Sequence, residues 1–428
     1  MKTVRIQEKD KEDLMKAKVL FFVFCFMVVI SLSTSLSLAQ KPIPEVVVGN
    51  ISAMTGPTSG THMMCLSGAK DYLYYLNEKM GGIAGKRGQM KVKYVAYDSQ
   101  YVATKAKDGF SRLQEQGMIV LTHCASGHSD ALMVDYEQAR IPLVTGSLGI
   151  ASVWSDWAYG NCHAGVVNLI RSWIVWVKGN WEKTAKSGET LVLGSIATDE
   201  PWAPLGLWDI DSFVKEQEIK LVMETIPKGT TDASPQLLRL KEAGAKQIFV
   251  LASAPGAVVV LNSARAMGLN IPLTQSAGAY LGDVIALGGP ELAEGYQGEY
   301  FFEPMSKNPK LESSPGLKLA RELWVKDHPG QSPSDMYIVG LLSGMVIAEG
   351  IHLALDEVPP DKLTGETLKK YGLDRIKNFD AMGLTKPITY IPGDHIGQKH
   401  VRYWVARKGY VEPLSDWMPT TTFRMPKK

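Results

Sequence analysis

Three of the four cysteines lie close to a histidine, and this pairing could bind a soft metal ion or support disulfide chemistry. The pairs are His62 with Cys65, His123 with Cys124, and Cys162 with His163. No C-x-x-C motif supports tight metal coordination, so three arrangements stay open: one disulfide plus one buried thiol, three buried thiols, or a metal site. We expect no metal and no cofactor.

A second segment with chemical potential is Gly127-His128-Ser129-Asp130-Ala131, a variant of the turn that presents a nucleophilic serine. Catalysis would also need a base held by a third group and an oxyanion hole. The turn is equally explained as the start of a helix, which Ser126 would cap. A serine hydrolase is therefore the less favoured function, and we predict that the protein is not an enzyme.

The elements that must position these residues alternate between apolar strand-like runs and amphipathic segments. A first group of strands is predicted at residues 46–51, 90–97, 118–122 and 142–145, and a second group at 191–196, 220–225, 247–252 and 272–275. This alternation of strands and helices is typical of parallel sheets covered by helices. It begins again with the second group of strands, which indicates two lobes.

The N-terminus resembles an export signal. A charged start is followed by an apolar run at residues 19–30 and by Ser37-Leu38-Ala39, which suits signal peptidase. We predict a signal peptide over residues 1–39 and a periplasmic or otherwise exported protein. Met15 would give a more compact leader, so both Met1 and Met15 stay open as the start.

The charge of the remaining chain is balanced. The leader contains six of the 46 basic and four of the 44 acidic residues, which leaves 40 of each. A chain with balanced charge lacks the excess of basic residues that attracts nucleic acid, so we expect no nucleic-acid partner. The mature chain of about 390 residues is long for one core, which again indicates two lobes.

Short motifs in a fixed order show a family resemblance. They include Thr55-Gly56-Pro57, Gly81-Gly82-Ile83-Ala84-Gly85-Lys86, Ala293-Glu294-Gly295-Tyr296, Asp335-Met336-Tyr337 and Pro392-Gly393-Asp394-His395. Over residues 46–417 the chain resembles the leucine/isoleucine/valine-binding branch of the periplasmic solute-binding proteins, which deliver small molecules to ABC transporters.

The resemblance implies an α/β fold of two similar lobes, each a mostly parallel sheet flanked by helices, joined by a three-crossing hinge. We predict one lobe from residues 40–163 plus 300–387 and the other from 164–299 plus 388–428. The implied function is the extracytoplasmic solute-binding component of an ABC importer, with a membrane permease as partner and a monomeric state. The alternative is a ligand-sensing receptor subunit of a signalling system.

Ligands of such sheets bind beyond the carboxyl ends of the strands. Through the resemblance, we predict ligand contacts from Thr61, Ala125, Ser126, Ser147, Gly149, Trp202 and Gly278. Ala125 and Ser126 fall where an N–H and a hydroxyl bind the ligand carboxylate, and Gly149 falls where the family places a threonine. We expect Trp202 to stack on the ligand.

Two departures from the family pattern bear on the ligand. Gly149 lacks the hydroxyl that helps to hold a ligand ammonium, and the loop at residues 275–279 lacks the acidic side chain. An ammonium buried without its anion is costly, so the sequence disfavours an α-amino acid unless Asp199, Glu200 or Asp283 supplies the charge. The predicted ligand is a small organic molecule: amino-acid-like, an aromatic acid, a short carboxylate or an amide.

Overall fold

The computed structural model describes Met15 and residues 42–56, 58–163, 165–200, 202–227 and 229–423. The chain divides into two units, Met1–Pro44 and Glu45–Lys428, and both sheets lie in the second. The predicted signal peptide, residues 1–39, lies outside the described residues except for Met15.

The first sheet has six strands in the order β2-β3-β1-β4-β5-β6. Its strands are β1 (Glu45–Ser52), β2 (Ile83–Gly85), β3 (Gly88–Asp98), β4 (Met118–His123), β5 (Leu143–Thr145) and β6 (Ala158–Gly160). All pairs are parallel except β2 with β3. The central strand β1 carries the run Val46-Val47-Val48, whose branched side chains suit a strand covered on both faces.

The second sheet has the order β13-β12-β11-β10-β9-β7-β8, and β14 pairs with β12. Its strands are β7 (Val192–Thr198), β8 (Lys220–Ile226), β9 (Ile248–Leu251), β10 (Leu273–Gln275), β11 (Gln297–Tyr300), β12 (His400–Arg407), β13 (Tyr410–Pro413) and β14 (Met418–Pro419). Strands β7 to β11 pair in parallel, whereas β12 to β14 are antiparallel additions.

Helices flank both sheets. With the first sheet lie α2 (Ser59–Met80), α3 (Ala103–Glu115), α4 (Ser126–Ala131), α5 (Met133–Ala139), α13 (Pro315–Asp327), α14 (Met336–Glu357), α15 (Gly365–Tyr371), and the 3₁₀ turns η1 (Ser152–Trp154), η2 (Pro360–Lys362) and η3 (Leu373–Arg375). With the second sheet lie α6 (Asn168–Trp181), α7 (Ala203–Gly206), α8 (Ile210–Glu216), α9 (Ser234–Glu242), α10 (Ala254–Ala266), α11 (Leu281–Gly288) and α12 (Pro290–Ala293). The predicted fold class is confirmed.

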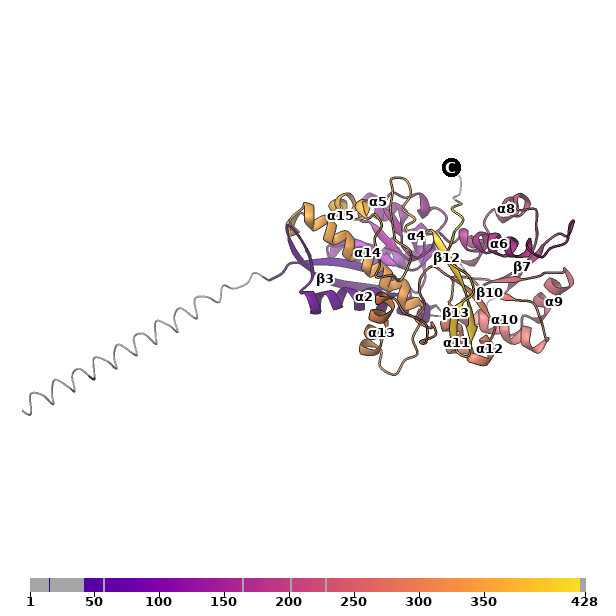
Figure 1. Ribbon diagram of the computed structural model, residues 1–428. Coiled ribbons are helices and arrows are strands. Elements are labelled where there is room, and N and C mark those ends of the chain that lie inside the picture. The colour runs from indigo at the N-terminus through magenta and orange to yellow at the C-terminus, as the bar shows by residue number, and fades with distance from the viewer. Residues whose placement is uncertain are drawn as a thin grey trace, which may run out of the picture. The chain divides into compact units, whose positions relative to one another are not determined.

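The most extensive contact between two helices is that of α2 with α14, which lie side by side (Figure 1). Glycines allow this close approach, because a Cβ on Gly340 would stand 1.7 Å from the Cys65 carbonyl oxygen and one on Gly68 would stand 2.0 Å from that of Tyr337. By length and composition α14 could cross a membrane, yet 83% of its most apolar window is buried in the protein. It is therefore a core helix.

The chain passes between the two sheets three times. It does so between β6 and α6, between β11 and α13, and just before β12. The third passage begins after Gly397, since its N–H still donates to the Gly160 carbonyl oxygen at 2.8 Å. The lobe boundaries given from the sequence stay a prediction.

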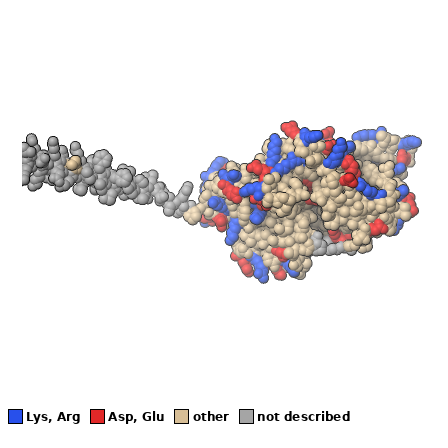
Figure 2. All heavy atoms as spheres, turned by 90° about the horizontal axis from the view of Figure 1, so that it is seen from below, with Lys and Arg blue, Asp and Glu red and all other residues tan. Residues whose placement is uncertain are grey.

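Charges of both signs are interspersed over the face displayed in Figure 2. Several form ion pairs at the surface, such as Arg140 with Glu366 at 2.7 Å and Arg239 with Glu224 at 2.6 Å. Exposed pairs of this kind contribute little to stability.

Candidate functional site

A cavity of about 70 Å³ lies where the carboxyl ends of strands from both sheets face each other. The first sheet contributes the start of α2 and the loops after β3, β4 and β5. The second sheet contributes the loops after β7, β9 and β10, and α14 adds Met336 and Val339. This is the place where ligands bind in open α/β sheets.

Five of the seven predicted ligand residues line this cavity: Thr61, Ser126, Ser147, Trp202 and Gly278. They come from different loops and from both sheets, so only the folded chain brings them together.

Ala125 does not line the cavity. It is buried, and its N–H donates to Nδ1 of His123 at 3.3 Å. The backbone donor predicted to bind a ligand carboxylate is thus already used inside the protein.

Gly149 also lies away from the cavity. Its N–H donates to the Ser152 hydroxyl at 2.8 Å, and a Cβ there would meet the Asp130 carboxylate at 2.3 Å. The Asp130 carboxylate also accepts hydrogen bonds from the N–H groups of the three residues after Gly149, at positions 150–152, and these bonds turn the loop inward. Gly146 and Ser147 stand at the cavity in its place.

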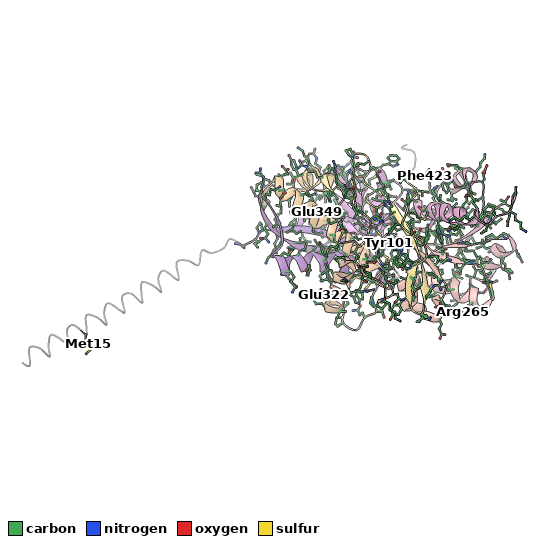
Figure 3. All side chains as sticks on the ribbon, viewed as in Figure 1. Met15, Tyr101, Arg265, Glu322, Glu349 and Phe423 are labelled. Carbon is green, nitrogen blue, oxygen red and sulfur yellow. The ribbon has the colours of Figure 1, made fainter. Side chains whose placement is uncertain are left out.

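Ser126 is the first residue of α4, and Ala125 is its N-cap. The predicted capping role of Ser126 is therefore wrong, since no side chain caps this helix. Burial raises the pKa of Tyr101 to about 12, and hydrogen bonding to Gly127 and Ser126 partly offsets that rise. Tyr101 thus stands over the start of α4, centrally in the view of Figure 3.

Ser129, the candidate nucleophile of the turn at residues 127–131, is fully buried. The Ser129 hydroxyl donates to the Ser147 carbonyl oxygen at 2.8 Å and to that of Ala125 at 3.3 Å. These bonds fix the loop that presents Ser147, so Ser129 has a structural role.

Neutral imidazoles surround Tyr101. Its ring centroid lies 5.1 Å from that of His62 and 5.1 Å from that of His128. Burial lowers the pKa of both histidines to about 4, and for His62 the nearby His128 adds to the effect. Burial also lowers the pKa of His163 to about 4, and its Nε2 lies 3.2 Å from the Ser147 hydroxyl. No Lys or Arg is among the described residues of the lining.

The charged group of the lining is Glu200, from the loop after β7. Its carboxylate accepts hydrogen bonds from the Ser253 hydroxyl at 2.6 Å and from the Trp202 indole N–H at 3.0 Å. Two donors therefore hold this anion in place before any ligand arrives. The loop at residues 275–279, after β10, lacks an acid, whereas Glu200 lines the cavity from the loop after β7, two strands away in the sheet.

Gly278 has a packing role against Trp202. A Cβ at residue 278 would stand 2.0 Å from the indole ring, so a side chain there would displace Trp202. Trp202 is half-buried and packs against the core with its ring at the cavity.

The three cysteines within the described residues are free thiols. Cys124 and Cys162 line the cavity, and the Cys162 sulfur lies 3.5 Å from the Tyr280 hydroxyl. Burial raises the pKa of Cys162 to about 12. No group of three or more metal-binding side chains occurs in the described part of the chain. Cys65 and Cys162 are buried, whereas Cys124 is partly exposed, which differs from three buried thiols.

Sequence reasoning missed Tyr101, Met336 and Val339 as lining residues. Tyr101 had a signal, because it follows β3 and this loop also opens at the carboxyl edge of the sheet. The two residues of α14 had none, since their place depends on how the chain returns from the second sheet.

Comparisons with known proteins agree with this architecture. The sequence pattern of the family described as periplasmic binding protein matches residues 45–408. No curated protein matches the sequence at a significant level.

Solved structures share the fold at low sequence identity. A branched chain amino acid ABC transporter protein from Thermus thermophilus with bound valine has a TM-score of 0.77 and 19% identity, and the match covers 88% of this chain and 97% of that one. A substrate binding protein of an Aeropyrum pernix ABC transporter has a TM-score of 0.75, 16% identity and coverage of 88% and 96%. A fatty acid ABC transporter substrate-binding protein from Thermomonospora curvata has a TM-score of 0.73, 17% identity and coverage of 88% and 92%.

The family pattern covers most of the chain, including every residue that lines the cavity and all strands of the two sheets except β13 and β14, so this chain belongs to the periplasmic binding protein family.

Proposed function

We propose that the protein is the extracytoplasmic solute-binding component of an ABC importer and delivers a small organic ligand to a membrane permease. The observation that carries this proposal is the cavity between the two sheets, with Ser126 on one side and Glu200 on the other. A ligand held by both lobes favours the closed arrangement over the open one, which gives the permease a state to recognise.

The lining favours a ligand that carries both a hydrogen-bond acceptor and a hydrogen-bond donor. Ser126 and Thr61 offer hydroxyl groups, whereas the fixed carboxylate of Glu200 requires an N–H donor or a cation. Trp202 adds a flat apolar surface. Amino-acid-like molecules and amides meet these demands, so Glu200 removes the main objection to an amino acid.

Acids without a donor group fit less well. A carboxylate near Glu200 would be repelled, and no lysine or arginine among the described lining residues compensates it.

A thermal-shift panel tests the proposal. We expect stabilisation by an amino acid or a short amide, about 2.7 kcal/mol at about 100 times its Kd, and none by benzoate or a short carboxylate without a donor. Titration calorimetry then compares variants with the compound that responds.

Ser126→Ala and Glu200→Gln should each weaken binding by about 1 to 3 kcal/mol, because each leaves a ligand group unsatisfied. Ser187→Ala and Glu216→Gln, which alter exposed residues, serve as matched controls and should bind like the wild type. Stabilisation by benzoate alone, together with unchanged affinity in Glu200→Gln, would contradict the proposed ligand chemistry.

A further inference from the structure

The N-terminal ends of α11 and α14, which pack with different sheets, lie against each other. An aspartate at the start of each helix accepts hydrogen bonds from residues at the start of the other. The Gly282 N–H of α11 donates to Oδ2 of Asp335, which precedes α14, at 3.0 Å. In return, the Asp283 carboxylate accepts from the Ser334 hydroxyl at 2.5 Å and from the Asp335 backbone N–H. Since α11 packs with the second sheet and α14 with the first, these bonds cross between the lobes.

Further donors of the second sheet and of the connecting segment converge on Asp335. Its carboxylate accepts from the Tyr300 hydroxyl at 2.7 Å, from the Ser306 hydroxyl at 2.6 Å and from the Ser306 N–H at 2.9 Å. Asp335 is fully buried, whereas Asp283 is partly exposed and only its Oδ2 is buried without a hydrogen-bond partner. Two neighbouring carboxyl groups with this little solvation cannot both be ionised at low cost, so a proton on the pair relieves the charge.

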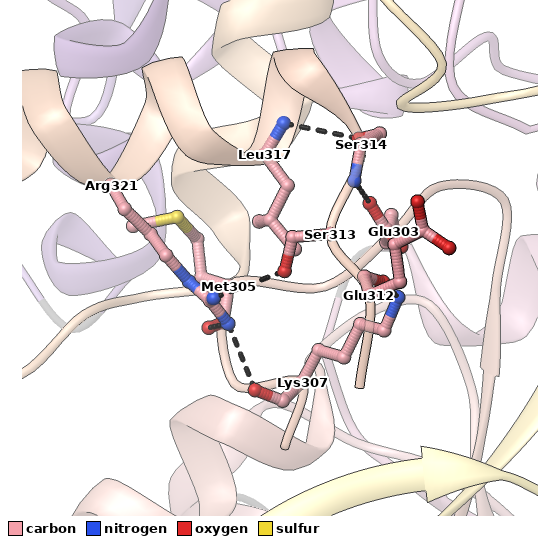
Figure 4. Close-up of polar contacts among 8 residues, drawn as sticks. All are labelled: Glu303, Met305, Lys307, Glu312, Ser313, Ser314, Leu317 and Arg321. Atoms are coloured by element: carbon pink, nitrogen blue, oxygen red, sulfur yellow. Dashed lines mark hydrogen bonds and ion pairs between the residues drawn. The ribbon is translucent and has the colours of Figure 1, made fainter. Parts of the chain in front are cut away.

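The segment that carries Ser306 is anchored to the first lobe (Figure 4). Arg321 of α13 donates to the carbonyl oxygens of Met305 at 3.0 Å and Lys307 at 2.8 Å. Lys307 itself pairs with Glu303. Ser306 is thereby held from both sides and presents its two donors to Asp335.

The other titratable groups on the surrounding elements are Tyr280, Glu299 and Tyr300 near the sheet edge, Lys307 and Arg321 on the anchored side, Arg265 and Glu291 on α10 and α12, Arg402, Tyr410 and Glu412 on β12 and β13, and Asp71 with His328 beside α14. Of these, Tyr300 donates a hydrogen bond to Asp335, and the Arg321 guanidinium interacts electrostatically with it. Burial also raises the pKa of Glu299 to about 8, so a comparison with Asp283→Asn is needed to assign a pH response to the aspartate pair. No hydrogen bond from a Lys or Arg reaches either aspartate among the described residues.

The pair lies directly behind the ligand cavity. Tyr280 stands three residues before Asp283, Met336 follows Asp335, and both line the cavity. Any movement that separates α11 from α14 would therefore move two walls of the ligand site.

We propose that Asp283 and Asp335 form a proton-dependent latch between the lobes, which positions Tyr280 and Met336 and takes up a proton from water when the cleft closes. The proton adds to one carboxylate oxygen and returns to water when the lobes separate. This inference rests on the proposed function, because it assumes lobes that open and close around a solute.

The direction of the pH effect follows from the closed site. Burial, with Asp335 nearby, raises the pKa of Asp283 to about 7, and burial also raises the pKa of Asp335. An acid whose pKa is higher in the closed form stabilises that form fully at low pH and loses the effect as pH rises through about 7. Alkaline conditions should open the cleft.

X-ray scattering of the ligand-free protein tests the latch. The radius of gyration of the wild type should be larger at about pH 8.5 than at about pH 5.5, whereas Asp283→Asn, which mimics the neutral acid, should stay compact at both. Asp211→Asn, on the exposed face of α8, is the matched control and should behave like the wild type.

Ser334→Ala is a second variant if Asp283→Asn folds poorly. The Ser334 hydroxyl favours the ionised form of Asp283, so its removal should shift the midpoint of the opening to higher pH. A radius independent of pH in the wild type, or an equal pH response in wild type, Asp283→Asn and Ser334→Ala, would overturn the latch. Because no ligand is used, such a result leaves the proposed solute binding intact, and a failed ligand panel leaves the latch untouched.

Discussion

At the scale of single residues, the site depends on how a few side chains hold each other. Glu200 is held by Ser253 and Trp202, and Trp202 in turn needs a glycine at residue 278. The indole is thus positioned before ligand arrives, which reduces the entropy that binding must overcome.

Trp202→Ala should weaken binding of the responding compound by about 1 to 3 kcal/mol, because the ligand loses an aromatic surface. The ligand-free protein should lose clearly less stability than the 3 to 5 kcal/mol that is roughly typical of a core tryptophan, since Trp202 is only half-buried. Titration calorimetry and urea unfolding on the same variant measure the two quantities.

Trp176→Ala is the matched control for this prediction. Trp176 stacks on Tyr403 with a centroid distance of 3.8 Å and does not line the cavity. It should lower stability and leave affinity unchanged. If Trp202→Ala gave that same pattern, the stacking role would be wrong.

At the scale of elements, the crossing of α2 and α14 fixes where the cavity wall stands. Met336 and Val339 occupy the first turn of α14, and Thr61 occupies the first turn of α2. The glycine contacts between these helices therefore set the position of residues that line the cavity.

Gly340→Ala should lower the free energy of unfolding by about 1 to 3 kcal/mol, despite the better helix propensity of alanine. The new methyl group would collide with the backbone carbonyl of Cys65, which cannot rotate away as a side chain can. The midpoint of urea unfolding measures the change.

Gly179→Ala in α6 is the matched control, because a Cβ at that position meets nothing within 4 Å. This variant should gain about 0.5 to 1 kcal/mol from helix propensity. Equal stability of Gly340→Ala and wild type would show that the two helices pack less closely than described.

At the scale of the whole molecule, α14 joins the apolar cores of the two lobes. Its first half, with Ile338 and Leu342, belongs to the same cluster as Trp173 and Phe249 of the second lobe. Its second half, with Ile351, belongs to a cluster of the first sheet. The lobes therefore share apolar packing through one helix.

This continuity predicts a single unfolding transition for the ligand-free protein. Far-UV circular dichroism and tryptophan fluorescence should give coincident urea curves, as a cooperative two-state transition requires. In Gly340→Ala both curves should move together. Two resolved transitions, with only one moved by the substitution, would contradict a shared core.

Local sequence patterns were enough to predict the fold class and the edge of the sheets at which the cavity lies. Runs such as Val46-Val47-Val48 specify buried strands through side-chain branching and apolar character, and both properties are local. Because parallel strands end at a common edge, the loops that hold Ser126 and Trp202 could be assigned to the site before their contacts were known.

Which groups of those loops face the cavity depends on packing between distant parts of the chain. The Ala125 N–H donates to His123 and Gly149 packs against Asp130, whereas Glu200 lines the cavity. The pairing of Asp283 with Asp335 joins residues 52 positions apart on two different lobes. Loop paths and the contacts between lobes arise from packing over the whole chain, and a local pattern of residues contains no information about them.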